Sequence, residues 1–186
     1  FMLAYGLCSP IFKKGATSRP SNYRPISLTC VCCRIMERII NRELIDYLLS
    51  HKLITKSQHR FLRRRSTCTN LLESVHDWAL YFNCKHTTDI IFIDFQKAFD
   101  TVSHPKLLAK IASYGIQENL LNWIASFLNG RSQSVKISGC ISDALHITSG
   151  VPQGSVLGPT LFLLFVNDSI DKVTGLNVNM KLFADD

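Results

Sequence analysis

The sequence has few of the features that mark secreted, membrane-bound or zinc-binding proteins. Its seven cysteines and six histidines contain no Cys/His set with the spacing of a zinc site. The cysteine count is odd, and the apolar start Phe1–Leu7 is too short for a secretory signal, with Lys13-Lys14 after it rather than before it. We therefore expect reduced thiols inside a cell. The longest apolar run, Val156–Val166, contains Gly158-Pro159 and falls short of the roughly 18 residues of a membrane span, so we expect no membrane partner.

Acidic residues are scarce in the first third of the chain. Residues 1–65 hold 13 Lys/Arg and 3 Asp/Glu, a net charge of +10, whereas residues 66–186 have a net charge of −3. With 46% hydrophobic and 19% charged residues, the composition is that of a globular domain, or of a domain with a smaller lobe. This charge division suits a protein that holds a polyanion with its basic part and a metal with clustered acids. A solvated basic surface is the alternative.

Apolar spacing predicts several helices. A helix is expected from Val31 to Leu49, with Thr29 as its N-cap. A second begins at Ser66 or Thr67, a third runs from Ser103 to Gly115, a fourth spans residues 117–128, and an apolar helix ends at Val166 after the loop 149–159. The apolar face expected of the second helix is Leu71, Leu72, Val75, Trp78, Ala79 and Phe82.

Strands are predicted between these helices. Strand fragments are expected within residues 9–28, and a hairpin is expected where Val135 and Ile137 alternate opposite Leu145 and Ile147. The run 89–94 has the pattern of a buried strand that ends on a carboxylate, and residues 177–183 alternate in the same manner. Helices and strands are interspersed, so the predicted fold class is α+β.

Three carboxylates are the strongest chemical signal. Asp94 follows the predicted strand 89–94, and Asp185 and Asp186 follow the second alternating run. Acids brought together repel one another unless cations lie between them, and hard divalent cations prefer oxygen ligands. The pattern therefore predicts a two-metal phosphoryl-transfer site. A regular strand would point Asp185 and Asp186 to opposite faces, so a turn at 184–186 is expected to bring at least one of them beside Asp94.

Three ordered stretches of the chain are distinctive: Phe92-Ile93-Asp94-Phe95-Gln96-Lys97-Ala98-Phe99-Asp100-Thr101-Val102-Ser103-His104, Gly150-Val151-Pro152-Gln153-Gly154-Ser155-Val156-Leu157-Gly158-Pro159 and Phe183-Ala184-Asp185-Asp186. In these stretches the sequence resembles the reverse transcriptases of non-LTR (LINE-type, jockey-like) retrotransposons. The front of the chain resembles the fingers motifs of that family at residues 10–15, 21–28 and 65–67.

The resemblance implies a right-hand polymerase fold that copies RNA into DNA. Residues 1–88 would be a basic fingers segment and residues 89–186 the palm, with the thumb absent. The implied partners are an RNA template, a DNA primer and deoxynucleoside triphosphates, in a nuclear or cytoplasmic ribonucleoprotein. Asp94 and Asp185 would hold two Mg²⁺ ions, or Mn²⁺ as a substitute, with Asp186 supporting them and the Phe95 main chain as a further ligand.

The resemblance also assigns nucleotide and template contacts. Phe99 would lie under the incoming sugar and exclude a 2′-hydroxyl, although a role as a core residue is the alternative. Gln153-Gly154 would approach the nascent base pair. The basic residues that would reach the triphosphate are Lys13, Lys14 and Arg24. Those that would follow the template phosphates, or simply be solvated, are Arg60, Arg63, Arg64 and Arg65.

The chain departs from the family pattern at three positions. The family commonly has Gly where Arg60 and Arg64 stand, and Arg where Leu62 stands. Two other functions therefore stay open: a decayed, non-catalytic remnant with residual nucleic-acid binding, and a maturase-type or telomerase-like polymerase. Because no thumb follows Asp186, the isolated chain is expected to be inactive or nearly so.

Overall fold

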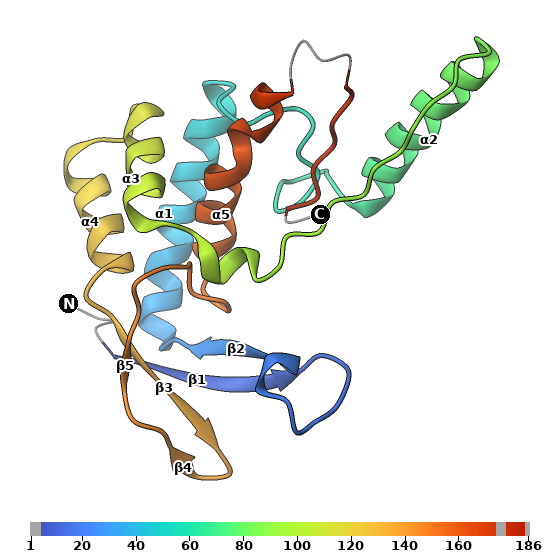
Figure 1. Ribbon diagram of the computed structural model, residues 1–186. Helices are drawn as coiled ribbons and strands as arrows, with labels where there is room; N and C mark the ends of the chain where they lie inside the picture. The colour runs from blue at the N-terminus through green and yellow to red at the C-terminus, as the bar shows by residue number, and fades with distance from the viewer. Residues whose placement is uncertain (1–4, 174–177, 185–186) are drawn as a thin grey trace.

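The computed structural model describes residues 5–173 and 178–184 and has a mixed α+β fold. Figure 1 shows α1, α3, α4 and α5 grouped beside one end of a twisted sheet, while α2 projects away from them. The predicted α+β class is therefore confirmed. Within the described residues, no helix is both long and apolar enough to cross a membrane.

The sheet joins strands from both halves of the chain. β1 pairs antiparallel with β2 and parallel with β3, and β3 pairs antiparallel with both β4 and β5. The predicted hairpin is confirmed, with Gln133 opposite Leu145 in its register. The strands are β1 (Tyr5–Phe12), β2 (Tyr23–Leu28), β3 (Ser132–Ile137), β4 (Cys140–Ile141) and β5 (Leu145–His146).

Pro10 explains why β1 is only partly enclosed. Residues 5–8 of β1 pair with β3, and that pairing ends at Cys8, two residues before Pro10. Proline has no N–H to donate to a ladder, so a proline in a strand needs one side of the strand open. The outer half of β1 pairs with β2 alone and forms a hairpin that extends beyond the rest of the sheet (Figure 1).

The observed helices follow most of the predicted boundaries. Short 3₁₀ helices lie at Pro20–Asn22, Ala98–Thr101 and Asn167–Lys172. The α-helices are α1 (Val31–Ser50), α2 (Thr67–Asn83), α3 (His104–Ser113), α4 (Glu118–Leu128) and α5 (Gly158–Val166).

The core lies between four helices, to which α2 does not belong. α1 contributes Leu44 and Leu48 from its second half, and α5 is buried on nearly all sides. The chief members from each helix are Leu44, Leu48, Leu107, Ile111, Ile124, Leu128, Leu161, Phe162, Leu163 and Leu164. Such an enclosed apolar cluster supplies most of the favourable free energy of folding.

Two predicted details of the helices are wrong. The N-cap of α1 is Cys30 rather than Thr29, because the Cys30 sulfur accepts the Cys33 N–H. The predicted apolar face of α2 is largely exposed, with only Trp78 half-buried, and no residue of α2 is buried. The polar face of α2 makes the contacts instead: Asn70 donates to the Leu182 carbonyl and Asp77 pairs with Lys181.

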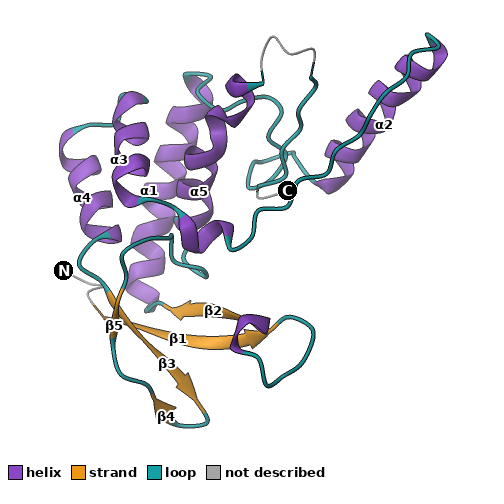
Figure 2. Cartoon of the chain, in the orientation of Figure 1, coloured by secondary structure: helices purple, strands orange, loops and turns teal. Residues whose placement is uncertain are grey.

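The two strands predicted to end on the acids are not formed. Residues 87–95 have no regular structure and form no backbone hydrogen bond with another described segment (Figure 2). Ile91 and Phe92 are 82% and 86% exposed. Residues 178–183 form only an isolated bridge, between Gln58 and Leu182. An apolar run becomes a strand only when a neighbouring strand satisfies its backbone groups, so the sequence pattern alone was insufficient here.

One departure from the family pattern coincides with an unusual backbone. Arg64, where the resemblance leads us to expect Gly, has φ +63° in the left-handed region. A side chain at such an angle costs of the order of 1 kcal/mol, which glycine avoids. The basic connection 50–65 therefore contains a turn that glycine would adopt more easily than Arg64.

Candidate functional site

The loop between β5 and α5 is held by backbone hydrogen bonds from two separate segments. Val151 N–H donates to the Phe99 carbonyl at 2.8 Å, and Gly150 N–H donates to the Val102 carbonyl at 2.8 Å. On the other side, the N–H of Ser27 in β2 donates to the Gln153 carbonyl at 2.7 Å. The loop therefore bridges the 3₁₀ turn at residues 98–101 and the β1–β2 hairpin.

Two glycines allow this close approach. Gly150 has φ +89°, and a Cβ there would lie 2.9 Å from the Cα and carbonyl oxygen of Asp100. Gly154 has φ +95°, and a Cβ there would lie 2.8 Å from the Ile26 side chain. Any larger residue would push the loop away from one of its two supports. The close approach at Gly154 is to β2, and its predicted approach to the nascent base pair stays a prediction.

Gln153 is oriented by a carboxylate. Its Nε2 donates to Asp100 Oδ1 at 2.8 Å, and the Ser149 hydroxyl donates to the Asp100 carbonyl at 2.9 Å. The side chains of both Gln153 and Asp100 are only partly buried. Asp100 therefore fixes the position of the Gln153 amide, whose oxygen remains available as an acceptor.

A buried histidine reinforces the same junction. His104 is 3% exposed, and its Nε2–H donates to the Gly150 carbonyl at 2.8 Å. Its Nδ1 lies 3.2 Å from Asn129 Oδ1, at the end of α4. The start of α3 and the end of α4 are thereby connected to the loop.

Phe99 lies partly in the core and partly at its edge. Its ring stacks on Phe162 of α5, with centroids 4.6 Å apart, and it meets Phe61 edge-on at 6.3 Å. The Phe99 carbonyl accepts the Val151 N–H, so the ring adjoins the loop that carries Gln153. This half-buried position is compatible with either of the roles considered for Phe99 in the sequence.

The basic candidates of the hairpin are solvent-exposed. Lys13 and Lys14 follow β1, and Arg24 lies in β2 opposite Ile11. The Lys13 N–H donates to the Asn22 carbonyl at 2.8 Å, which closes the end of the hairpin. The loop that carries Gln153 contacts the same strand at Ile26 and Ser27, two and three residues after Arg24.

The described residues do not test whether the predicted metal ligands lie together. Asp94 and Phe95 lie on the exposed segment 87–95, and Asp185 and Asp186 lie outside the described residues. Within the part of the chain that is described, no three His, Cys, Asp or Glu side chains are grouped as a metal site would require.

The four basic candidates after α1 have different surroundings. Arg60 lies over the rings of Phe61 and Phe183, at 5.1 and 4.9 Å from their centroids. Arg65 pairs with Glu73 at 3.1 Å. Arg63 and Arg64 are exposed. Two of these cations are thus committed to contacts within the chain.

Ala184, the residue before the predicted acid pair, is hydrogen-bonded to Gln58 of the basic connection 50–65. The Ala184 N–H donates to Gln58 Oε1 at 3.2 Å, and the same oxygen accepts the Arg60 N–H at 2.9 Å. The backbone of His59 donates to the Leu182 carbonyl, and Leu182 donates to the Ser57 carbonyl, both at 2.9 Å. Gln58 is 1% exposed, so this attachment is shielded from water.

His59 lies at the centre of a charged cluster beneath this attachment. Its side chain is fully buried, with Nε2 at 3.3 Å from Glu73 and Nδ1 at 3.0 Å from the Thr69 hydroxyl. Burial lowers the pKa of His59 below its usual value, Glu73 opposes this, and the positive charges of Arg65 and Lys181 reinforce it. Neutral imidazole is therefore the favoured form.

The N-terminal end of α5 is held by a buried carboxylate. Glu37 of α1 is 1% exposed, and its Oε2 accepts the N–H groups of Val156 and Leu157 at 2.7 and 3.0 Å. Its Oε1 has no hydrogen-bond partner within the described structure. Two N–H groups at the start of a helix are thus satisfied by a residue 119 and 120 positions away.

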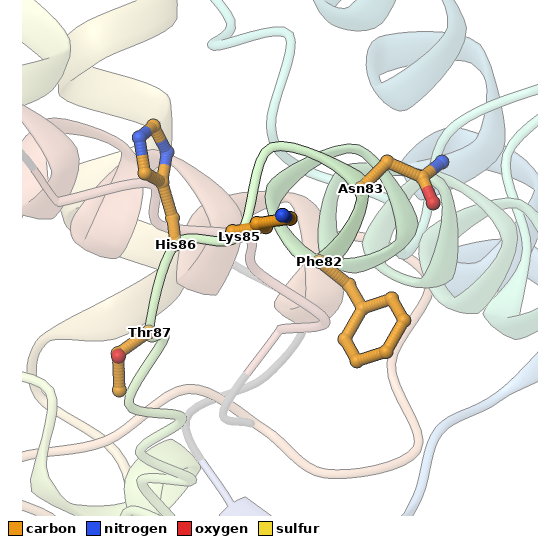
Figure 3. A pocket seen from close by; sticks show the side chains of 5 residues that line it. All are labelled: Phe82, Asn83, Lys85, His86 and Thr87. Atoms are coloured by element: carbon orange, nitrogen blue, oxygen red, sulfur yellow. The ribbon is translucent and has the colours of Figure 1, made fainter.

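One hollow of the described structure is unrelated to these residues. It has a volume of about 540 Å³ and lies at the end of α2, where its lining comes from one short segment. Figure 3 shows the Phe82 and His86 side chains projecting in different directions around it, together with Asn83, Lys85 and Thr87. A second hollow of about 280 Å³ is lined in part by Arg63, Phe61 and Val156.

Comparison with known proteins identifies the family. A family model described as reverse transcriptase (RNA-dependent DNA polymerase) matches residues 11–186. The chain belongs to the reverse transcriptase family. Its relatives include the RNA-directed DNA polymerase from mobile element jockey of Drosophila funebris, 37% identical over 170 residues, covering 89% of this chain and 18% of the relative. The jockey polymerase of Drosophila melanogaster is 36% identical over 182 residues, or 95% of this chain and 20% of the relative.

This reverse transcriptase domain is homologous to those of non-LTR retrotransposons over most of its length. The probable RNA-directed DNA polymerase from transposon X-element of Drosophila melanogaster is 32% identical over 184 residues, covering 97% of this chain and 20% of the relative. The chain spans about a fifth of the length of these relatives.

Solved telomerase structures share the fold. Telomerase from Candida albicans, in complex with a TWJ fragment of telomeric RNA, matches with a TM-score of 0.66 and 14% identity, covering 100% of this chain and 37% of that one. The apo telomerase of Candida tropicalis gives a TM-score of 0.61 at 14% identity, covering 91% and 39%. At this identity the comparison establishes the fold of the reverse transcriptase domain and no more.

Several residues that position the site of this reverse transcriptase were missed in the sequence. Glu37 and Gln58 each reach a partner far away along the chain, so no local pattern marks them. A signal existed for Asp100 and His104, which both lie inside the first of the family-like stretches.

Removing the Glu37 carboxylate should destabilise the domain. Glu37→Ala leaves the N–H groups of Val156 and Leu157 buried without an acceptor, and should lower the free energy of unfolding by about 2–3 kcal/mol. Glu37→Gln keeps one acceptor oxygen and should cost less than about 1 kcal/mol. Urea unfolding followed by circular dichroism measures both.

Glu43→Ala, on the exposed side of the same helix, is the control and should change stability by less than about 0.5 kcal/mol. Equal losses for Glu37→Ala and Glu43→Ala would contradict this role.

The neutral state of His59 should make stability depend on pH. Because the folded pKa lies below the unfolded value, the unfolded chain binds the proton first as the pH falls below about 6.5. The contribution is complete above that pH and is lost on acidification toward the folded pKa. Urea midpoints measured between about pH 5 and 8 should fall more steeply for the native sequence than for His59→Gln. His86→Gln, an exposed histidine, should keep the native slope; an unchanged slope in His59→Gln would contradict the assignment.

Proposed function

We propose that this chain is the fingers and palm portion of a jockey-like retrotransposon polymerase that copies RNA into DNA. The observation that carries the proposal is the loop 149–157, which joins Gln153 and Gly154 to β2 and to the turn that carries Phe99 and Asp100. Residues 1–88 would serve as the fingers segment and residues 89–186 as the palm. The whole polymerase would act on an RNA template, a DNA primer and deoxynucleoside triphosphates in an intracellular ribonucleoprotein.

The nucleotide would bind beside the loop. Phe99 would lie under the sugar, because its ring is half-buried and adjoins the backbone of Val151. Gln153 and Gly154 would face the nascent base pair, with the Gln153 amide oriented by Asp100. The exposed cations of the hairpin, Lys13, Lys14 and Arg24, would neutralise the triphosphate.

Template contacts would come from the basic connection. Arg63 and Arg64 are exposed and suited to phosphate, whereas Arg60 and Arg65 already contact side chains of the chain. We therefore expect the first pair to contribute more to nucleic-acid affinity than the second.

The three candidate acids, Asp94, Asp185 and Asp186, have the oxygen ligands that divalent metal ions prefer. The Asp94 carboxylate is exposed and makes no hydrogen bond or ion pair with the described part of the chain, so its oxygens are available to a hard cation. Asp94 and Asp185 would hold two Mg²⁺ ions or Mn²⁺, supported by Asp186 and by the Phe95 carbonyl. When bound, the ions would lower the pKa of the primer hydroxyl and neutralise charge on the phosphates.

A second candidate is a decayed element copy that binds nucleic acid without catalysis. The left-handed backbone of Arg64, at a position where the family commonly has Gly, favours it. The presence of Asp94, Asp185 and Asp186 favours the polymerase. Activity measurements distinguish the two candidates.

DNA synthesis should depend on Asp94. We expect primer extension on an RNA template with Mg²⁺ when residues 1–186 replace the matching segment of the Drosophila funebris jockey polymerase. Asp94→Asn should reduce the rate at least about 100-fold, because it removes a metal-binding charge. Asp89→Asn, on the same exposed segment, is the matched control and should stay within about twofold.

The 186-residue chain alone should give little or no extension, because its Asp94 segment has no fixed partner among the described residues. A folded chimera without synthesis would refute the polymerase and favour the decayed copy. Equal rates for the Asp94→Asn and Asp89→Asn chimeras would refute the metal role of Asp94.

Sugar selection should depend on Phe99. In the same chimera, Phe99→Val should raise ribonucleotide incorporation at least about tenfold relative to deoxynucleotides, since a smaller side chain leaves room for the 2′-hydroxyl. Phe92→Val, an exposed aromatic of the preceding segment, should leave the ratio unchanged. If Phe99→Val lowers stability while discrimination stays native, Phe99 is a core residue only.

A further inference from the structure

The N-terminus of α1 carries two cysteines in contact. The sequence Cys30-Val31-Cys32-Cys33 spaces the first and last thiols three residues apart, so they face one another across the first turn of the helix. Their Sγ atoms lie 3.1 Å apart. The Cys33 N–H also donates to the Cys30 sulfur at 3.4 Å, which makes Cys30 the N-cap.

The two thiols are chemically unequal. Cys30 is exposed, whereas Cys33 is 5% exposed. Hydrogen bonding from the Cys33 side chain, together with its backbone N–H, lowers the pKa of Cys30, because both donors stabilise the thiolate. Burial raises the pKa of Cys33 to about 11. An accessible thiolate beside a buried thiol is the arrangement that dithiol–disulfide chemistry uses.

Cys32 does not share this geometry. It is exposed on the same turn, but residues one and two apart on a helix do not face each other. A structural metal is not indicated, because no three potential ligands are grouped within the described residues. The contact between Cys30 and Cys33 therefore stands as a pair.

We propose that Cys30 and Cys33 form a reversible dithiol–disulfide site, which small disulfides such as glutathione disulfide oxidise. Its basis is the contact between the two sulfurs at the helix N-terminus, and it is independent of the polymerase function proposed above.

The reaction proceeds in two exchanges. The Cys30 thiolate attacks one sulfur of glutathione disulfide, a bond forms between Cys30 and that sulfur, and one glutathione thiolate leaves and takes up a proton. The Cys33 thiol then loses its proton and attacks Cys30 Sγ, which releases the second glutathione. The chain loses two hydrogen atoms, that is two protons and two electrons, and one glutathione disulfide becomes two glutathione molecules.

The position gives the site a structural setting. In the sequence, the pair lies between two residues that hold other elements. Ser27 of β2 donates to the Gln153 carbonyl, and Glu37 of α1 accepts the N–H groups at the start of α5. The sulfurs need only a small approach to reach bonding distance, and the bridge would close a short local loop. We therefore expect oxidation to leave the fold intact.

Mass spectrometry of the full 186-residue chain in glutathione buffers tests the proposal. After acid quenching and alkylation, we expect a peptide linking Cys30 to Cys33 that has lost two hydrogen atoms, and its recovery as two thiols after excess reduced glutathione. At pH 7, iodoacetamide should modify Cys30 about three- to tenfold faster than Cys32. Denaturant should abolish this difference, because it requires the folded helix terminus.

Three variants separate the proposal from general thiol oxidation. Cys32→Ser should still form the bridge. Cys33→Ser should stop at one glutathione attached to Cys30, and Cys30→Ser, whose new hydroxyl can still cap the helix, should form no bridge. Circular dichroism reports whether each variant keeps its helices. A bridge that uses Cys32, a bridge only between chains, or equal alkylation of Cys30 and Cys32 in the folded chain would overturn the proposal.

Discussion

The arrangement of this reverse transcriptase domain depends on how one loop is held between elements that are distant in sequence. Residues 149–157 receive hydrogen bonds from β2, donate to the turn at residues 98–102 and end on the Glu37 carboxylate of α1. Each bond alone contributes about 1 kcal/mol, or somewhat more when one partner is charged. Together they fix the hairpin, the core helices and the Phe99 turn relative to one another. The loop therefore connects the main parts of the domain, although its own sequence has no helical or strand pattern.

Prediction from the sequence succeeded where a segment carries its own packing partner nearby. α3 and α4 follow one another, and the apolar faces read from the sequence meet in the core at Leu107, Ile111 and Ile124. The family-like stretches also singled out Gln153 and Gly154, whose nucleotide role stays a prediction. Local periodicity is a reliable guide when burial follows it directly.

Prediction failed where structure depends on a remote partner. The apolar run before Asp94 has the composition of a strand, yet Ile91 and Phe92 are exposed because no described strand pairs with them. α2 shows the converse, since its polar residues Asn70 and Asp77 make the contacts while its apolar face stays exposed. For the same reason Glu37 was overlooked: a buried glutamate in an amphipathic helix gives no sign of the two N–H groups that it serves.

The two sides of the proposed site are held to different degrees. Gln153 is fixed by Asp100 and by the β2 backbone, so the nucleotide side is organised by bonds within the chain. The approach to Asp185 relies instead on Gln58, whose single oxygen accepts N–H groups from both Arg60 and Ala184. This amide joins the basic connection to the residue before the acid pair. The basic connection and the residue before the acid pair therefore share one buried acceptor, although more than a hundred residues separate them in sequence.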